Sequence, residues 1–447
     1  MRADDGVLLA VRRGHSPNCS ATGSVVGLAL VSAVACAAVV NAFADRFASW
    51  RRAPPPDTPP PKLRPERFGA LLAWPLPAAV LLLDHEGAQA AIDAGAVVVG
   101  RAHAPDQALS APIEVHVAVT GRCPASCDGC YLDAGPDGAP PDPALDDDLR
   151  KLADAGVLEI ALGGGEVLLR DDLLELGERI AALGMVPNLT TSGFGLTETH
   201  ARRMAATFGQ VNVSLDGLGA DYAEVRGWDG AALGLRAIRT LVAAGVRVGV
   251  NTVIARPNLG SLEAMGTALA ALGVSEWQWL RFKPAGRGRQ AWDRLAPTTA
   301  DLVGLWPRAL AIERDTGLVL RWDCAMVPFL AAHEVPMAHL RTLAVEGCPG
   351  GRSLLARGLD GRFAPCSFTD GDADDPDVAW ASSPKLRRWR ERAAAPPEPC
   401  ASCHWQPVCG GGCRVVAAHL AGDERAADPQ CPRVAGSGIE SFQPTSM

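Results

Sequence analysis

Three cysteines, Cys123, Cys127 and Cys130, form a C-x3-C-x2-C loop directly after an apolar, strand-like segment. Three thiolates can hold three irons of a 4Fe–4S cluster and leave the fourth iron open to another ligand. A structural zinc site is the alternative, but such a site usually needs a fourth protein ligand nearby. The aromatic Tyr131 directly after the third cysteine favours the cluster. The spacing therefore predicts an iron–sulfur cluster with one open iron.

A second group of cysteines lies near the C-terminus. Its seven members, in order, are Cys348, Cys366 (in the element Gly361-x4-Cys366), Cys400, Cys403, Cys409, Cys413 and Cys431. The chain has 13 cysteines in all, an odd number that fits a secreted disulfide framework poorly. Metal or cluster ligation in a reducing compartment fits better, although zinc could occupy any four of the seven. Cys324 lies outside the pattern, and Cys19 and Cys36 are expected to be either buried small apolar residues or part of the N-terminal segment.

The elements that position the first loop alternate between apolar strand-like and amphipathic helix-like runs from residue 112 onward. This rhythm indicates βα units and a parallel sheet. Strands are predicted at 113–120, 158–162, 186–191, 210–215, 247–254 and 277–282, with helices such as 171–183, 231–244 and 262–272. Six repeats favour an incomplete barrel, with its chemistry at the C-terminal ends of the strands.

Polar and glycine-rich elements follow three of these strands. The second strand ends in Gly163, Gly164, Gly165 and Glu166, the third in Thr190, Thr191, Ser192 and Gly193, and the fourth in Ser214, Leu215, Asp216 and Gly217. An Arg226-Gly227 pair comes shortly afterwards. Glycines allow a backbone to approach a ligand closely, and a carboxylate suits an ammonium group.

Together these motifs resemble the radical S-adenosylmethionine (SAM) superfamily over roughly residues 112–290. The resemblance implies a partial (β/α)6 barrel in which the cysteine triplet holds the cluster that binds SAM. It implies that Gly164, Gly165 and Glu166 contact the SAM amino group, that Ser214 contacts the ribose, and that Arg226 meets the SAM carboxylate. Ser192 stands where relatives often have Asn, which is a departure from the pattern. Asp216 is the candidate catalytic acid or hydrogen-bond partner, and an ordinary loop ion pair between Asp216 and Arg226 is the alternative.

The C-terminal spacing resembles the SPASM domain, which carries two auxiliary 4Fe–4S clusters. By this resemblance Cys400, Cys403, Cys409 and Cys431 hold the outer cluster, and Cys348, Cys366 and Cys413 hold the inner one. The inner cluster is then one protein ligand short. Cys324 could supply it, but its place outside the pattern favours a site that is open to a substrate thiolate.

SPASM-bearing relatives mostly modify peptides or proteins, so the resemblance implies hydrogen abstraction from a ribosomally made peptide. Flavodoxin or ferredoxin would be the electron donor. A cofactor- or small-molecule-maturing enzyme is the alternative. A sulfatase maturase is disfavoured because Ser367 stands where such enzymes have Asp, and a non-catalytic iron–sulfur protein is disfavoured by the intact strand-end motifs.

The N-terminal third has a different composition. A charge-free run at 16–44 is compatible with a signal peptide, a membrane anchor or a fused leader, and weak flanking charges would leave the rest of the chain cytoplasmic. A Pro-rich linker at 53–65 precedes two strands and a helix that loosely resemble a peptide-binding module. The expected domains are 1–52, 53–65, 66–111, 112–300, 301–347, 348–435 and a tail at 436–447.

Two further expectations concern partners and the cavity. The formal net charge of −8 gives no basic footprint for nucleic acid. Trp277, Trp279 and Phe282 are expected either to line the substrate cavity or to fill a packed barrel interior.

Overall fold

The computed structural model describes residues 7–8, 28–29, 60–75, 78–101, 109–333, 335–337, 340 and 345–435. Within this part of the chain no helix is long and apolar enough to cross a membrane. Of the charge-free run at 16–44, Leu28–Ala29 forms the short strand β2, and the rest lies outside the described residues.

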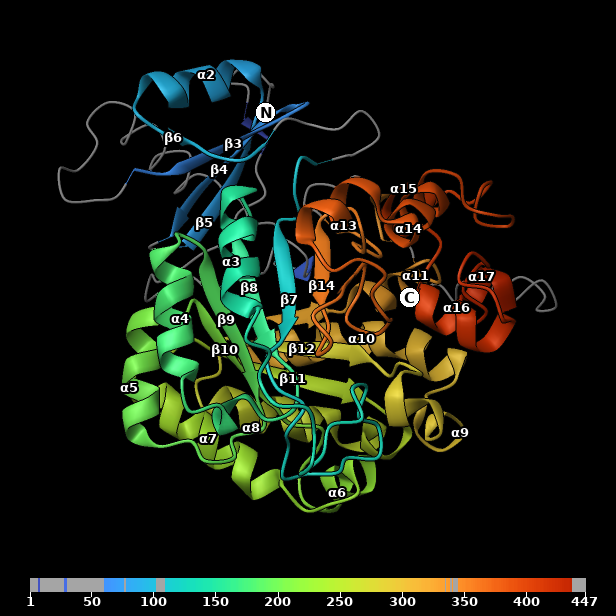
Figure 1. The fold of residues 1–447 in the computed structure, drawn as a ribbon. Coiled ribbons are helices and arrows are strands. Elements are labelled where there is room, and N and C mark those ends of the chain that lie inside the picture. The colour runs from blue at the N-terminus through green and yellow to red at the C-terminus, as the bar shows by residue number, and fades with distance from the viewer. Residues whose placement is uncertain are drawn as a thin grey trace.

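A curved sheet of parallel strands forms the centre of the molecule (Figure 1). Its strands in spatial order are β7 (Glu114–Ala118), β8 (Glu159–Gly163), β9 (Val186–Thr191), β10 (Gln210–Ser214), β11 (Val248–Ile254) and β12 (Glu276–Arg281). These are the six predicted strands, each within two residues of its expected bounds. Every neighbouring pair is parallel, so all six carboxyl ends lie at one edge of the sheet.

Helices cover the outer face of this sheet (Figure 1). They are α3 (Leu145–Asp154), α4 (Leu173–Ala182), α5 (Glu198–Thr207), α7 (Ala231–Ala243), α8 (Leu262–Ala271) and α10 (Thr299–Thr316), whereas the short helices α6 (Ala220–Arg226) and α9 (Trp292–Leu295) lie at the carboxyl edge of the sheet. Short 3-10 turns η1 (Val167–Leu169), η2 (Arg256–Ser261), η3 (Gly286–Arg289) and η4 (Cys324–Met326) fall in the connections.

Short strands extend the sheet beyond the six predicted strands on both sides. On one side β13 (Leu320–Trp322) pairs in parallel with β12, and β2 pairs antiparallel with β13. On the other, β14 (Leu354–Arg357) pairs in parallel with β7 and antiparallel with β15 (Phe363–Ala364). The sequence missed them because runs of two to four residues carry no readable period.

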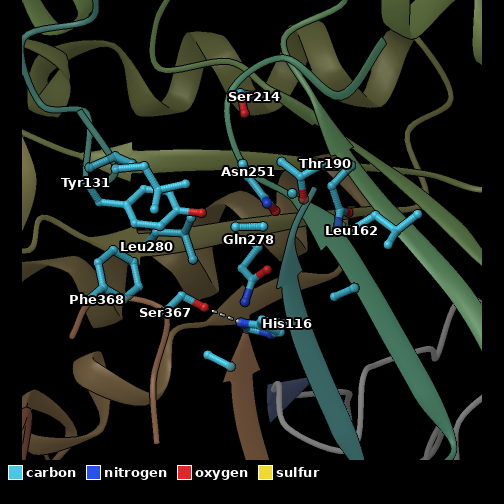
Figure 2. A pocket seen from close by; sticks show the side chains of 18 of the residues that line it. His116, Tyr131, Leu162, Thr190, Ser214, Asn251, Gln278, Leu280, Ser367 and Phe368 are labelled. Carbon is cyan, nitrogen blue, oxygen red and sulfur yellow. Dashed lines mark hydrogen bonds between the residues drawn. The ribbon is translucent and has the colours of Figure 1, made fainter. Parts of the chain in front are cut away.

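Strand β12 shows which way the aromatic side chains face. Trp277 and Trp279 are fully buried in the hydrophobic core between sheet and helices, and Trp277 Nε1 donates to Thr252 Oγ1 at 2.7 Å. Their neighbours Gln278 and Leu280 point into the barrel lumen (Figure 2). Both expectations for the two tryptophans were therefore wrong, whereas Phe282 does line the cavity. The alternation of side chains along a strand fixes this division.

A small sheet precedes the barrel (blue in Figure 1). It contains β1 (Val7–Leu8), β3 (Lys62–Glu66), β4 (Gly69–Pro75), β5 (Ala78–Leu83) and β6 (Val97–Val98), covered by α2 (His85–Asp93). The hairpin and helix match the prediction, but β3 begins inside the segment predicted as linker. Buried Arg64 explains this strand, because its guanidinium donates to Glu66 and to the carbonyls of Pro112 and Gly156.

The C-terminal cysteine-rich region packs beside β14 (red in Figure 1). Its helices are α13 (Pro376–Ser382), α14 (Pro384–Ala394), α15 (Gln406–Cys409), α16 (Arg414–Ala421) and α17 (Pro432–Ala435), and α11 (Val327–Leu330) precedes them. A buried ion pair joins this region to the barrel: Arg281 at the end of β12 donates to both oxygens of Asp428, at 2.5 and 3.0 Å.

Candidate active site

The first cysteine loop lies at the carboxyl edge of the sheet, directly after β7. Backbone hydrogen bonds fold it back on itself, such as Cys123 N to Gly135 O at 2.9 Å. Cys123, Cys127 and Cys130 all line a cavity of about 470 Å³ in the barrel lumen. Burial raises the pKa of the Cys123 thiol, and the charges of Cys127 and Cys130 raise it further. The structure thus brings the predicted triplet together at one site.

The surroundings of the triplet fit an iron–sulfur cluster. Trp228 Nε1 donates to Cys127 Sγ at 3.1 Å, and Arg226 Nη1 lies 3.8 Å from the same sulfur. Hydrogen bonds to ligand sulfurs are one of the means by which proteins set cluster potentials. Among the described residues, no three His, Cys, Asp or Glu side chains converge on a single metal ion. A 4Fe–4S cluster places each thiolate on a different iron, so it accepts a wider spacing than one ion does.

The glycine element lies against this loop. Gly164 has φ 129°, and a Cβ there would lie 2.5 Å from the carbonyl oxygen of Thr120. A Cβ on Gly165 would overlap the carbonyl of Arg122, and the Gly165 N–H donates to Thr120 O at 2.7 Å. Only glycine permits this approach. The backbone of Gly163, Gly164 and Gly165 therefore faces the cavity beside the cysteine loop.

The carboxylate of Glu166 is occupied by the protein itself. It is 1% exposed, and it accepts hydrogen bonds from Thr191 Oγ1 at 2.5 Å, from Ser192 N at 2.9 Å and from Ser192 Oγ. It also caps η1 through the N–H of Leu168 at 3.1 Å. Glu166 thus ties the end of β8 to the end of β9. Ser192 lines the cavity next to this link.

Asp216 and Arg226 form an ion pair at the cavity wall. Arg226 Nε donates to Asp216 Oδ2 at 2.5 Å, and Val253 N donates to Asp216 Oδ1 at 2.7 Å. Burial lowers the pKa of the Arg226 guanidinium, but the combined effects of Asp216, Tyr222 and Cys127 more than offset it, and the net shift is upward. The alternative raised from the sequence, a loop ion pair, is therefore present. Both residues nevertheless line the cavity, with the arginine beside Cys127.

The lumen continues from the cysteine loop toward the C-terminal region (Figure 2). Ser214 lines it at the end of β10. The Tyr131 ring lies 4.9 Å from the Phe368 ring, centroid to centroid. Ser367 Oγ is 2.9 Å from His116 Nδ1, a hydrogen bond between the C-terminal region and β7. One continuous cavity therefore has residues of both the barrel and the C-terminal region in its wall.

Several of the C-terminal cysteines are buried and interact electrostatically. Burial raises the pKa of Cys409 to about 12, with added effects of Cys431 and Cys400, and it raises that of Cys400, with an added effect of Cys403. These four are the cysteines predicted to hold the outer cluster, an assignment that stays a prediction. Among the three cysteines predicted for the inner cluster, burial raises the pKa of Cys366 to about 12, and the charges of Cys348 and Cys413 raise it further.

Sequence reasoning missed several residues of the cavity. Trp228 stands two positions after Arg226, but nothing in the sequence shows its N–H directed at a cysteine sulfur. Lys283 is buried between the Asp323 carboxylate and the Phe368 ring, with Nζ 4.5 Å from the ring centroid. A lysine just after a strand in the middle of a barrel sequence was the available signal. His116 could have been found from the alternation along β7.

Comparisons with known proteins bear on the whole arrangement. A family model described as the radical SAM superfamily matches residues 117–263, which carry the loop and the strand-end motifs. A PqqA peptide cyclase from Methylocella silvestris is 30% identical over 347 residues, covering 74% of this chain and 89% of that protein. The chain belongs to the radical SAM superfamily. It is therefore an enzyme whose cofactors are SAM and 4Fe–4S clusters, as the sequence predicted.

Other relatives of this radical SAM enzyme align with a similar share of the chain. A mycofactocin maturase from Mycobacterium ulcerans is 28% identical over 344 residues, covering 73% of this chain and 89% of that protein. The crystal structure of Streptococcus suis SuiB bound to SAM has a TM-score of 0.64 at 16% identity, covering 83% of this chain and 98% of that one. SuiB bound to the precursor peptide SuiA gives 0.65 at 17% identity. At such identities the likeness shows the fold, a radical SAM barrel with a C-terminal cysteine-rich region, and confirms the predicted fold class.

Proposed function

We propose that this radical SAM enzyme modifies a ribosomally made peptide. When bound at the cluster, SAM would supply the radical chemistry that takes a hydrogen atom from a substrate carbon. The observation that carries the proposal is the continuous cavity, which runs from the cysteine loop to Cys366, Ser367 and Phe368 of the C-terminal region. A peptide side chain in this lumen would lie between the radical source and the auxiliary clusters.

The contacts described above suggest a role for each residue. Cys123, Cys127 and Cys130 hold the SAM-binding cluster. The backbone of Gly164 and Gly165 is open to the SAM amino group, and Arg226 lies beside Cys127, where it can meet the SAM carboxylate.

Two of the remaining polar residues can contact SAM, and two others hold neighbouring residues in place. Ser192 and Ser214 line the cavity and can contact SAM directly. Glu166 and Asp216 act through others, because the protein already donates hydrogen bonds to both carboxylate oxygens of each. Glu166 sets the glycine element, and Asp216 sets Arg226.

The C-terminal region at 348–435 would act as an electron-accepting domain. Cys400, Cys403, Cys409 and Cys431 hold its outer cluster, and Cys348, Cys366 and Cys413 contribute to its inner one. An external donor such as flavodoxin or ferredoxin would reduce the SAM-binding cluster.

The module at 66–111 would receive the peptide. In the described part of the small sheet, β6 is an edge strand with Val97 46% and Val98 52% exposed. An extended peptide can add to such an edge through main-chain hydrogen bonds. Strand β3, which begins before residue 66 and belongs to the same small sheet, packs on the barrel core at 112–300 through Arg64 and through Lys62, whose Nζ donates to Leu183 O at 2.9 Å.

The names of the relatives mostly support a peptide substrate, since one is a PqqA peptide cyclase and SuiB was solved with a precursor peptide. A pre-heme d1 synthase from Dinoroseobacter shibae, also 30% identical and covering 70% of this chain and 84% of that protein, favours a second candidate. That candidate is maturation of a cofactor with no peptide partner.

The test is to incubate the reconstituted enzyme with SAM, a reductant and a short peptide encoded beside its gene. We expect a mass change in the peptide and 5′-deoxyadenosine formed in proportion to it. The matched control carries Cys123, Cys127 and Cys130 changed to Ala and should do neither. Nucleoside release that no peptide alters, but a small-molecule precursor stimulates, would favour the second candidate.

A further inference from the structure

Cys324 lies outside the seven-cysteine pattern, yet the fold brings it to the same place. It begins η4, one residue after the aspartate that follows β13, at the carboxyl edge of the sheet. Its side chain lines the cavity, as does that of Cys366. The sequence left the inner cluster with three cysteines and favoured an open fourth position.

A pair of side chains links the backbone next to Cys324 to the backbone of Cys413. Arg281 Nη1 donates to Ala325 O at 3.1 Å and to Asp428 Oδ2 at 2.5 Å. The same Asp428 oxygen accepts the N–H of Cys413 at 2.9 Å. Arg281, Asp428 and Cys413 are all almost fully buried. One arginine–aspartate pair thus holds both the backbone next to Cys324 and the backbone of Cys413.

A second link runs from Cys324 toward Cys366. Asp323 forms a buried ion pair with Lys283, and Cys324 Sγ lies 3.3 Å from Asp323 Oδ1. The Lys283 ammonium lies over the ring of Phe368, two residues after Cys366, at 4.5 Å. The turn that carries Cys366 and the turn that carries Cys324 therefore meet at one lysine.

A buried cation lies among these residues. Lys283 is almost fully buried, pairs with Asp323 next to Cys324, and lies over the ring of Phe368, two residues after Cys366. A buried cation beside several thiols is suited to a negatively charged, thiolate-bound cluster.

We propose that Cys324 is the fourth protein ligand of the inner auxiliary cluster, completing the set of Cys348, Cys366 and Cys413. This inference rests on the auxiliary clusters of the proposed function. It closes the inner cluster to substrate thiolates, so that cluster serves electron transfer rather than substrate binding. Peptide recognition is then left to the cavity wall and the N-terminal module.

The test uses the full chain with Cys123, Cys127 and Cys130 changed to Ala, so that only the auxiliary clusters contribute to the spectra. Cys324→Ala and the near-isosteric Cys324→Ser are compared with this parent by iron content and by electron paramagnetic resonance of the reduced protein. Each sample is measured with and without 2-mercaptoethanol, which can bind only an open iron. Cys366→Ala is the positive control for the inner cluster, and Cys400→Ala perturbs the outer one.

We expect the spectrum of the parent to stay unchanged when the thiol is added. Cys324→Ala should either respond to the thiol or lose about four irons, as Cys366→Ala does. A parent that responds to the thiol, together with Cys324 variants that match it in iron and spectrum, would overturn the proposal. If Cys366→Ala also matches its parent, the inner cluster itself is absent, and the auxiliary part of the proposed function fails instead.

Discussion

The hydrogen bond from Trp228 to Cys127 should set part of the reduction potential of the SAM-binding cluster. Trp228→Phe removes the indole N–H, which lies 3.1 Å from the sulfur. It retains a ring that can stack on Phe194, now 5.1 Å away, and meet Tyr222 edge-on at 5.4 Å. The change therefore tests the donor with little change in packing.

The direction and size of the expected change in reduction potential follow from the charge of the cluster. The reduced cluster carries one more negative charge, so the N–H stabilises it more than the oxidised form, and losing the N–H lowers the potential. A net hydrogen bond is worth roughly 0.5–1.5 kcal/mol. For one electron, about 59 mV corresponds to 1.4 kcal/mol, so the potential should fall by roughly 20–60 mV.

The assay is a redox titration followed by electron paramagnetic resonance, with the SAM-binding cluster recognised by its spectral change on addition of SAM. Phe194→Leu is the matched control, because it removes the stacking partner and leaves the N–H in place. An unchanged or higher potential in Trp228→Phe, or an equal fall in the control, would refute the reasoning.

Three further predictions concern stability and SAM binding. Asp428→Asn should lower the free energy of unfolding by about 3–5 kcal/mol in denaturant titrations, because it leaves a buried arginine without its counter-charge. Asp374→Asn, in an exposed pair, should cost less than about 1 kcal/mol, and equal losses would contradict the account. Gly165→Ala should weaken SAM binding at least about tenfold in equilibrium dialysis because its Cβ would overlap the cysteine loop, whereas Gly260→Ala, with nothing within 4 Å, should bind normally. Burial raises the pKa of Glu313 from 4.5 to about 7, so its stabilising effect is complete below pH 4.5 and lost as the pH rises through 7. At pH 8 the free energy of unfolding of Glu313→Gln should then exceed that of the parent by up to roughly 3 kcal/mol, whereas at pH 4 the two should be equal. A difference that is independent of pH would contradict this.

The barrel could be predicted from the sequence because its strands are long and apolar enough to show their period. The six strands from β7 to β12 and the helices α4, α7 and α8 fall where the pattern placed them. The edge strands β13 and β14 could not be found, since three or four residues give no periodic signal. Cys324 follows β13 directly, so its position in the fold could not be predicted either.

The residue types of the site were predictable, but the direction of each side chain was not. The spacing of Cys123, Cys127 and Cys130 indicated one site because close spacing in a loop restricts where thiols can go. Glu166 was expected to face SAM, yet hydrogen bonds from the end of β9 occupy its carboxylate. Trp277 was expected inside the barrel and faces the helices, because the register of a strand decides its face and one residue reverses it.

The central claim is that the first cysteine loop holds the cluster that cleaves SAM. The most direct measurement is the iron content and the release of 5′-deoxyadenosine from anaerobically reconstituted protein, with and without Cys123, Cys127 and Cys130 changed to Ala. We expect about twelve irons to fall to about eight and nucleoside release to stop. Zinc in place of iron, or nucleoside release that survives loss of the three cysteines, would contradict the claim.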